Sequence, residues 1–189
     1  METIYFEKTG RINTLETLKC ALSAAKEMKI DTIVVASTGG ASALEAIKIF
    51  DESYQLVIVT HHDGFRDIGN EFPTHIKEEI LQKRPTTIFH TGTHAFAGLE
   101  RSFRLHQQTM LPIEMIAITI RKCFGEGTKV TMEMTIMVSD AGLIDTTKDI
   151  ISIAGTGRGL DTAWIVKPSY SNSLFDLKMK VPICKPRNF

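Results

Sequence analysis

Short apolar runs alternate with stretches of helical spacing along the first half of this chain. The run 32–36 is almost wholly apolar and β-branched, which is typical of a strand buried on both faces of a parallel sheet. Strands that alternate with amphipathic helices predict an α/β fold, here a three-layer α/β/α arrangement with a mostly parallel sheet. The predicted strands are 32–36, 55–60 and 86–90, and the predicted helices are 13–30, 43–50 and 73–81.

Polar and proline residues indicate where helices begin. Asn13 can cap a helix whose third residue is Glu16, which is the spacing of a capping box. Pro73 suits the first turn of one helix. Pro112 opens another helix, which we expect to end near residues 125–127.

The segment 129–143 fits two kinds of secondary structure. Its apolar residues alternate as in a strand, yet Val130, Met134 and Met137 also share one helical face. The length favours a helix that ends at Gly142 as a C-cap. Its methionine stripe is then expected to pack in the core.

The last third of the chain is expected to complete the sheet. The runs 149–154 and 162–166 predict two further strands. The tail 174–185 looks extended, and Pro182 and Pro186 suit an edge strand better than a central one because proline cannot donate to the ladder.

Composition favours a single domain over residues 1–189. With 22 basic and 22 acidic residues, the chain lacks the cationic excess that a nucleic-acid partner requires. Cys20, Cys123 and Cys184 are odd in number and far apart, which is typical of a reducing compartment. No signal peptide and no apolar run of about 20 residues is visible, so we expect a cytoplasmic protein without a membrane partner. Homo-oligomerisation is left open.

Four polar or glycine-rich loops follow predicted strands, and ligands of parallel α/β sheets bind where such loops gather. The first loop leads at once into a helix, so its N–H groups and the helix dipole can hold a phosphate. The alternative is a tight turn with Ser42 as a helix cap. This loop consists of Ser37, Thr38, Gly39, Gly40, Ala41 and Ser42.

The second loop contains His61, His62 and Asp63, a combination that suggests a metal site. Adjacent side chains need a distant third ligand, and His90 or His94 could supply it. We favour the alternative to a metal site, in which the loop is simply solvated or the two histidines hydrogen-bond to a bound ligand.

The third loop, with Gly92, Thr93 and His94, can line the same cleft together with Thr60. His94 could serve as an acid, a base or a hydrogen-bond donor, or it could only cap the helix that contains Leu99. The candidate catalytic residues are therefore His61, His62 and His94.

The fourth loop surrounds Arg158 with glycines, and Leu160 replaces the last glycine of a dinucleotide fingerprint. The loop also leads into a strand, so we exclude a Rossmann site. Arg158 can pair with phosphate, and Asp161 can orient it or accept from a hydroxyl. A purely structural turn is the alternative. The candidate contacts are Gly155, Thr156, Gly157, Arg158, Gly159 and Asp161.

The chain resembles the C-terminal α/β domain of pyruvate kinase in the segments 32–43, 56–60, 129–143 and 149–156. That resemblance implies a regulatory module whose corresponding loops hold the phosphates of a sugar bisphosphate in some members. The chain is too short to contain the catalytic barrel as well, so we expect no phosphorylation of ADP.

The chain is also similar to a small family of stand-alone archaeal and bacterial proteins built from this domain. The matching segments are 91–95, 155–163, 167–168 and 175–178. The resemblance implies a bound flavin mononucleotide (FMN) and no established reaction. We therefore expect an FMN-binding protein, which could be a flavin-dependent oxidoreductase. The alternatives are a sensor of a sugar phosphate and a metal-dependent phosphohydrolase built on His61, His62 and Asp63.

Overall fold

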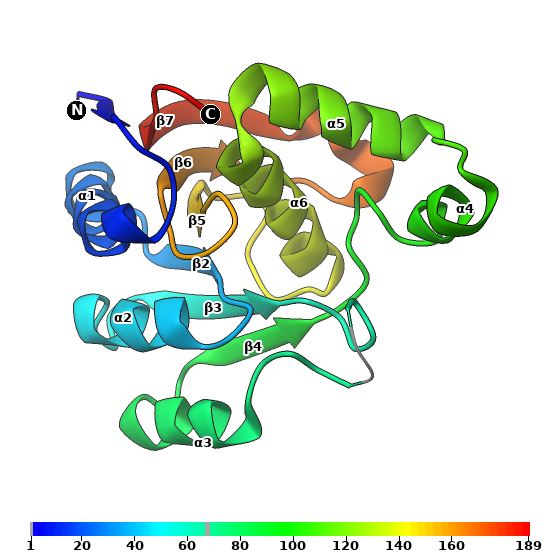
Figure 1. Ribbon diagram of the computed structural model, residues 1–189. Helices are drawn as coiled ribbons and strands as arrows, with labels where there is room; N and C mark the ends of the chain where they lie inside the picture. The colour runs from blue at the N-terminus through cyan, green and yellow to red at the C-terminus, as the bar shows by residue number, and fades with distance from the viewer. Residues whose placement is uncertain (1, 67–68) are drawn as a thin grey trace.

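The computed structural model describes residues 2–66 and 69–189. Within these ranges, seven strands form one sheet in the order β1-β7-β6-β5-β2-β3-β4 (Figure 1). The block β5-β2-β3-β4 is parallel, whereas β6 runs antiparallel to both of its neighbours. The strands are β1 (Ile4–Phe6), β2 (Thr32–Ala36), β3 (Gln55–Thr60), β4 (Ile88–Thr91), β5 (Ile150–Ala154), β6 (Thr162–Lys167) and β7 (Lys178–Pro186).

Helices cover both faces of the sheet, which confirms the three-layer α/β/α prediction (Figure 1). On β2, Ile33 and Val35 point into a core shared with α1, α2 and α3, while Val34 points into a second core shared with α5 and α6. The α-helices are α1 (Thr14–Met28), α2 (Ala41–Ile49), α3 (Thr74–Lys83), α4 (Glu100–Gln107), α5 (Pro112–Phe124) and α6 (Glu126–Asp140), and the 3-10 helices are η1 (Arg11–Asn13) and η2 (Ser171–Asp176).

Helix α6 resolves the ambiguous segment in favour of a helix. It begins at Glu126, three residues earlier than predicted, and Gly142 follows its end with a left-handed φ of +67°. Met134 and Met137 are buried in the second core, as expected for a packed methionine stripe.

The capping box predicted at Asn13 is wrong. Helix α1 does begin at Thr14, but the Asn13 side chain makes no capping bond and donates instead to the Lys8 carbonyl, at 2.7 Å. The reason is η1, which gives Asn13 a helical backbone (φ −92°, ψ −4°) where a capping residue needs an extended one.

The tail is not an edge strand. Strand β7 lies between β6 and β1, and the short β1 forms the edge. Pro182 is accommodated because the β6–β7 register shifts next to its partner Trp164, as prolines in sheets require. Among the described residues, no helix combines the length and the apolar character needed to cross a bilayer.

Candidate ligand site at the carboxyl edge of the sheet

The predicted loops meet at one edge of the sheet. Strands β2, β3, β4 and β5 are parallel, so the loops that follow them lie together, and antiparallel β6 begins at the same edge. The start of α1 also reaches this edge, where Leu160 N–H donates to Thr14 Oγ1 at 3.0 Å. The fold therefore brings together the four loops that the sequence singled out.

The first loop leaves the start of α2 open. Ser37 Oγ accepts from Ala43 N–H at 3.3 Å, and the N-cap position is Gly40, which has no side chain to cap the helix. Ser42 is buried inside the first turn, so the Ser42 cap that belonged to the alternative interpretation of this loop is not formed. In the part of the chain that the structure describes, nothing accepts from the N–H groups of Gly39 and Ala41.

The two glycines of this loop differ. Gly40 has φ +89°, and a Cβ there would lie 2.5 Å from Ile76 Cγ2, so its lack of a side chain serves packing. Gly39 is exposed, and a Cβ there would meet nothing within 4 Å. Gly39 is thus the position at which a ligand can approach the backbone.

The fourth loop is built around a buried carboxylate. Asp161 Oδ2 accepts from the N–H groups of Gly10 (2.7 Å) and Thr156 (3.1 Å), and its Oδ1 accepts from the Thr162 hydroxyl (2.7 Å). The side chain is fully buried. We therefore assign Asp161 to the scaffold of the loop and not to the groups that touch a ligand.

The rest of the same loop contains two glycines that pack closely and two residues that face solvent. A Cβ on Gly155 would lie 2.3 Å from the Gly159 carbonyl oxygen, and one on Gly159 would lie 2.4 Å from Arg11 Cα, so both glycines serve packing. Gly157 and Arg158 are exposed, and no described residue forms an ion pair with Arg158. The guanidinium is consequently free to meet an anion.

Rings from the second and third loops gather into one cluster. The His94 ring centroid lies 5.3 Å from those of both His61 and His62 and 4.7 Å from that of Phe65. Arg101, from α4, places its guanidinium 4.3 Å from the Phe65 ring centroid. The structure thus joins the three histidines that the sequence proposed as catalytic candidates.

Hydrogen bonds tie this cluster to the first loop. His61 Nε2 lies 3.5 Å from Thr38 Oγ1, and His61 Nδ1 lies 3.0 Å from Glu71 Oε1. The Thr60 and Thr91 hydroxyls are 2.7 Å apart at the ends of β3 and β4. Glu71 was missed by the sequence analysis because its partner His61 is ten residues away in the chain and no repeated pattern links the two.

The residues present do not form a metal centre in the described ranges. No group of three His, Cys, Asp or Glu residues there has the arrangement needed to hold an ion. In these ranges His90 makes no ring contact with the cluster. It lies against Gly92 instead, since a Cβ added at Gly92 would lie only 2.7 Å from His90 Nε2. Asp63 is held by Asn70, at 2.8 Å.

A buried ion pair lies behind the third loop. Lys129 Nζ and Glu133 Oε2 are 2.5 Å apart on α6, with side chains only 3% and 5% exposed. Glu133 Oε1 accepts from Phe96 N–H at 2.8 Å, so the pair holds the chain just after His94. Sequence analysis placed both residues in a helix but gave them no role, although the i, i+4 Lys–Glu spacing inside an apolar stripe was a usable signal.

We compared the chain with models of known protein families and with solved structures. The model of the pyruvate kinase alpha/beta domain matches residues 16–166. The chain belongs to this family. Among solved structures, this α/β domain is similar to Cryptosporidium parvum pyruvate kinase in complex with ADP, at 11% identity and a TM-score of 0.43. The match covers 82% of this domain and 24% of that chain, so the domain spans about a quarter of the enzyme's length.

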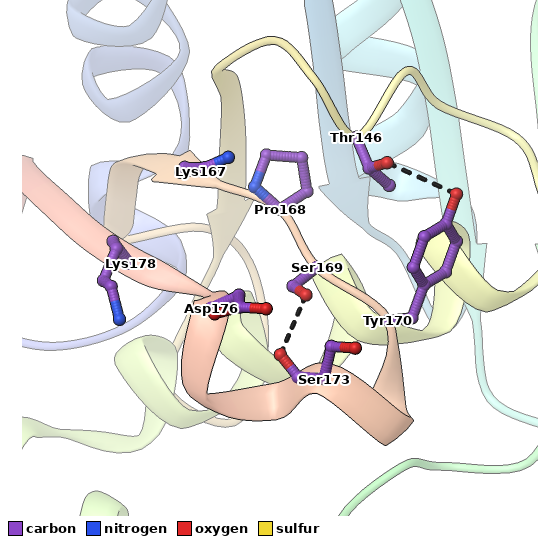
Figure 2. Close-up of a pocket in the computed structure, with 8 residues that line it drawn as sticks. All are labelled: Thr146, Lys167, Pro168, Ser169, Tyr170, Ser173, Asp176 and Lys178. Atoms are coloured by element: carbon purple, nitrogen blue, oxygen red, sulfur yellow. Dashed lines mark hydrogen bonds between the residues drawn. The ribbon is translucent and has the colours of Figure 1, made fainter.

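Two cavities of the α/β domain lie at the opposite edge of the sheet. One, of about 420 Å³, is bounded by hydroxyl groups and by Lys167 and Lys178, and the Tyr170 and Thr146 hydroxyls lie 3.3 Å apart in it (Figure 2). The other, of about 340 Å³, lies near Lys29 and Asp149. Neither contains a residue of the four predicted loops.

His94, in the third loop, lies beside the buried pair of Lys129 and Glu133. Burial lowers the pKa of His94 to about 4 from an ordinary value of 6.5. The Glu133 carboxylate opposes this shift, while His61, His62 and Lys129 add to it. His94 is therefore neutral at pH 7. It can accept or donate a hydrogen bond without bringing a charge into the site.

His94 is also expected to make stability depend on pH. Between pH 4 and about 6.5 the unfolded chain binds a proton that the folded chain does not, so stability is complete above pH 6.5 and falls as the pH drops toward 4, by up to about 3 kcal/mol. Urea unfolding of His94→Gln should lack this part of the slope, whereas the exposed His106→Gln should keep it. A slope identical in His94→Gln and the wild type would contradict a half-buried His94 that is kept neutral in the folded chain.

Proposed function

We propose that the carboxyl edge of this domain binds a phosphorylated small molecule, with FMN as the first candidate. The open start of α2 carries the proposal. The N–H groups of Gly39 and Ala41 have no acceptor among the described residues, and the backbone at Gly39 is accessible, whereas Ala43 N–H is already bonded to Ser37 Oγ. Helix N-termini with free N–H groups favour phosphate. The residues proposed to hold the phosphate are Thr38, Gly39, Ala41 and Arg158.

Arg158 supports the same proposal from a neighbouring strand. It follows β5, which pairs with β2, and its guanidinium is exposed and unpaired in the described chain. An arginine in that state can make two directed, charge-assisted hydrogen bonds to a phosphate. Gly157, beside it, leaves the approach open, because a Cβ there would meet nothing within 4 Å.

The cluster of His61, His62, Phe65 and His94 supports a ligand with a planar ring. Aromatic and imidazole rings contact such ligands in offset or edge-on geometry. FMN would supply two-electron transfer to a substrate that we leave open. The histidines would orient the ligand and hold or release protons, with neutral His94 as an acceptor. The proposed reaction class is therefore that of a flavin-dependent oxidoreductase.

One observation favours a second candidate, a sensor of a sugar phosphate. The Phe65 ring already has Arg101 at 4.3 Å and packs against the three histidine rings, so its surface is largely occupied. The hydroxyl groups of Thr38, Thr60 and Thr91 at the same edge suit a polyol as well as a ring. A sugar phosphate would use the same phosphate contacts.

Titration with FMN, riboflavin and a sugar phosphate tests the proposal. We expect freshly purified protein, or protein reconstituted with FMN, to show a flavin absorption spectrum. Gly39→Val should weaken FMN binding strongly without loss of stability, because its Cβ enters open space. Arg158→Ala should weaken FMN about ten- to a hundredfold and riboflavin far less. The matched control is Arg187→Ala, at the residue that follows β7, two strands away from β5 in the sheet.

The outcomes separate the candidates. Tight binding of a sugar phosphate with no binding of FMN would favour the sensor. Equal losses for FMN and riboflavin in Arg158→Ala would remove the fourth loop from the phosphate site. Unchanged FMN affinity in Gly39→Val would overturn the site at α2.

A further inference from the structure

A histidine stands between a hydroxyl group and a carboxylate at the carboxyl edge of the sheet. His61 Nε2 lies 3.5 Å from Thr38 Oγ1, and His61 Nδ1 lies 3.0 Å from Glu71 Oε1. The side chains of His61 and Glu71 are 24% and 18% exposed, so their contact is shielded from most of the solvent. We name Thr38, His61 and Glu71 the threonine triad.

The carboxylate determines which nitrogen of His61 carries the proton. An ionised carboxylate can only accept hydrogen bonds, so His61 Nδ1–H donates to Glu71 Oε1. The lone pair of Nε2 then faces the Thr38 hydroxyl and can accept its proton. Two neighbours hold this arrangement: the Phe65 ring centroid lies 4.1 Å from that of His61, and Arg66 Nη1 lies 3.6 Å from Glu71 Oε2.

The fold places Thr38 where a nucleophile lies in one large class of α/β enzymes. Thr38 is half-buried in the short turn between β2 and α2, and His61 directly follows β3, the neighbour of β2. In that class the nucleophile stands on a strand-to-helix turn, and the N–H of the next residue helps to bind an oxyanion. Here the next residue is Gly39, whose N–H has no acceptor in the described ranges and whose surroundings are open.

We propose that the threonine triad hydrolyses esters of small carboxylic acids, with Thr38 as nucleophile, His61 as general base and Glu71 as the residue that positions His61. Such a unit needs a base within reach of the nucleophile and a third group that orients the base, and its distances are often long before a substrate binds. The N–H groups of Gly39 and Ala41 would stabilise the negative charge on the carbonyl oxygen. This activity goes beyond ligand binding and does not depend on FMN.

The donors around Thr38 favour a carboxylic ester over a phosphate ester. Attack on a carbonyl carbon develops negative charge on one oxygen, which two N–H groups can serve. Phosphoryl transfer spreads charge over three oxygens and uses cations around them. Arg66, the arginine of the second loop, is already paired with Glu71.

The proposed reaction has two halves, with water as the co-reactant. In the first, Thr38 Oγ1 forms a bond to the carbonyl carbon, its proton passes to His61 Nε2, and the alcohol takes up that proton as its C–O bond breaks. In the second, water attacks the acyl carbon and gives a proton to His61. The bond to Thr38 then breaks, Thr38 Oγ1 recovers a proton from His61, and the carboxylic acid leaves.

Release of p-nitrophenol from p-nitrophenyl acetate by the full chain tests the proposal. We expect His61→Gln to lower kcat at least about a hundredfold, because general base catalysis contributes about 10²–10⁴. Thr38→Val should have a similar effect, whereas Thr38→Ser should stay active because it keeps the hydroxyl. The matched controls are His106→Gln and Thr119→Val, at exposed positions on α4 and α5, which should hydrolyse the ester like the wild type.

Glu71→Gln separates a positioning role from a purely structural one. A glutamine amide can donate to Nδ1 and so hold His61 in the wrong tautomer. We expect kcat to fall about a hundredfold while KM stays within about twofold, and circular dichroism should show a folded chain. An unchanged kcat would remove Glu71 from the triad and overturn the proposal.

Labelling with a fluorophosphonate reagent gives a second, independent measurement. Thr38 Oγ1 would attack the phosphorus and displace fluoride, while its proton passes to His61. Mass spectrometry should find one added group per chain, on the peptide that contains Thr38, and Thr38→Val should remove it. A wild-type chain that is neither labelled nor able to hydrolyse the acetate ester would overturn the proposal, even if that chain binds FMN. So would hydrolysis that survives Thr38→Val, or turnover of p-nitrophenyl phosphate in place of the acetate.

Discussion

Asp161→Ala is expected to lower the free energy of unfolding of the domain by about 3–5 kcal/mol, because Asp161 holds the fourth loop together. The substitution leaves the N–H groups of Gly10 and Thr156 and the Thr162 hydroxyl without their acceptor. A lost bond to a buried charged group costs about 1.5–3 kcal/mol, and part of the deficit is recovered when water enters. The melting temperature should fall by about 10 °C in a domain of this length.

Urea unfolding of Asp161→Ala beside Asp176→Ala measures this effect. Asp176 lies on the opposite edge, and its side chain makes no hydrogen bond to the described residues, so its replacement should change the stability by less than about 0.5 kcal/mol. If Asp161→Ala instead unfolded like the wild type and lost only its affinity for FMN, the carboxylate would belong to the ligand site after all.

Asp161 also shows where sequence analysis stops. Its residue type, in a glycine-rich loop with an arginine, suggested a ligand contact. Its role depends on Gly10, 151 residues away in the chain, and no local pattern indicates that contact. The same holds for Gly40, whose side-chain space is taken by Ile76 of α3, while the neighbouring Gly39 remains open. Sequence reasoning found the loop but could not tell its two glycines apart.

The fold was more predictable because its signals are local and repeated. The apolar run of β2 and the amphipathic helices around it define a parallel α/β layer without any knowledge of long-range contacts. Strand β1 escaped prediction because it has three residues, mostly exposed, and exists only through pairing of Ile4 with Cys184. The position of β7 inside the sheet follows from that same distant pairing.

The pair of Lys129 and Glu133 leads to the second large effect. Glu133→Gln leaves a buried ammonium without its carboxylate, and Lys129→Met leaves a buried carboxylate whose remaining contact is Phe96 N–H. Breaking a buried ion pair from one side typically costs about 3–5 kcal/mol. The double variant Lys129→Met/Glu133→Gln should cost less than either single variant, because no charge remains and the glutamine oxygen can still accept from Phe96.

The pH dependence of Glu133→Gln distinguishes this origin from a loss of packing. Burial lowers the pKa of Lys129, and Glu133 opposes that shift through its charge and its hydrogen bond. Without Glu133 the pKa of Lys129 should fall further. Between that lowered value and the ordinary 10.5, the unfolded chain binds a proton that the folded chain has released, so the stability of Glu133→Gln should rise with pH more steeply than that of the wild type. The double variant has no lysine at this position and should lose the added slope. Parallel slopes in all three proteins, or a double variant whose cost equals the sum of the two single costs, would show that the two side chains act independently and that their ion pair does not hold the third loop in place.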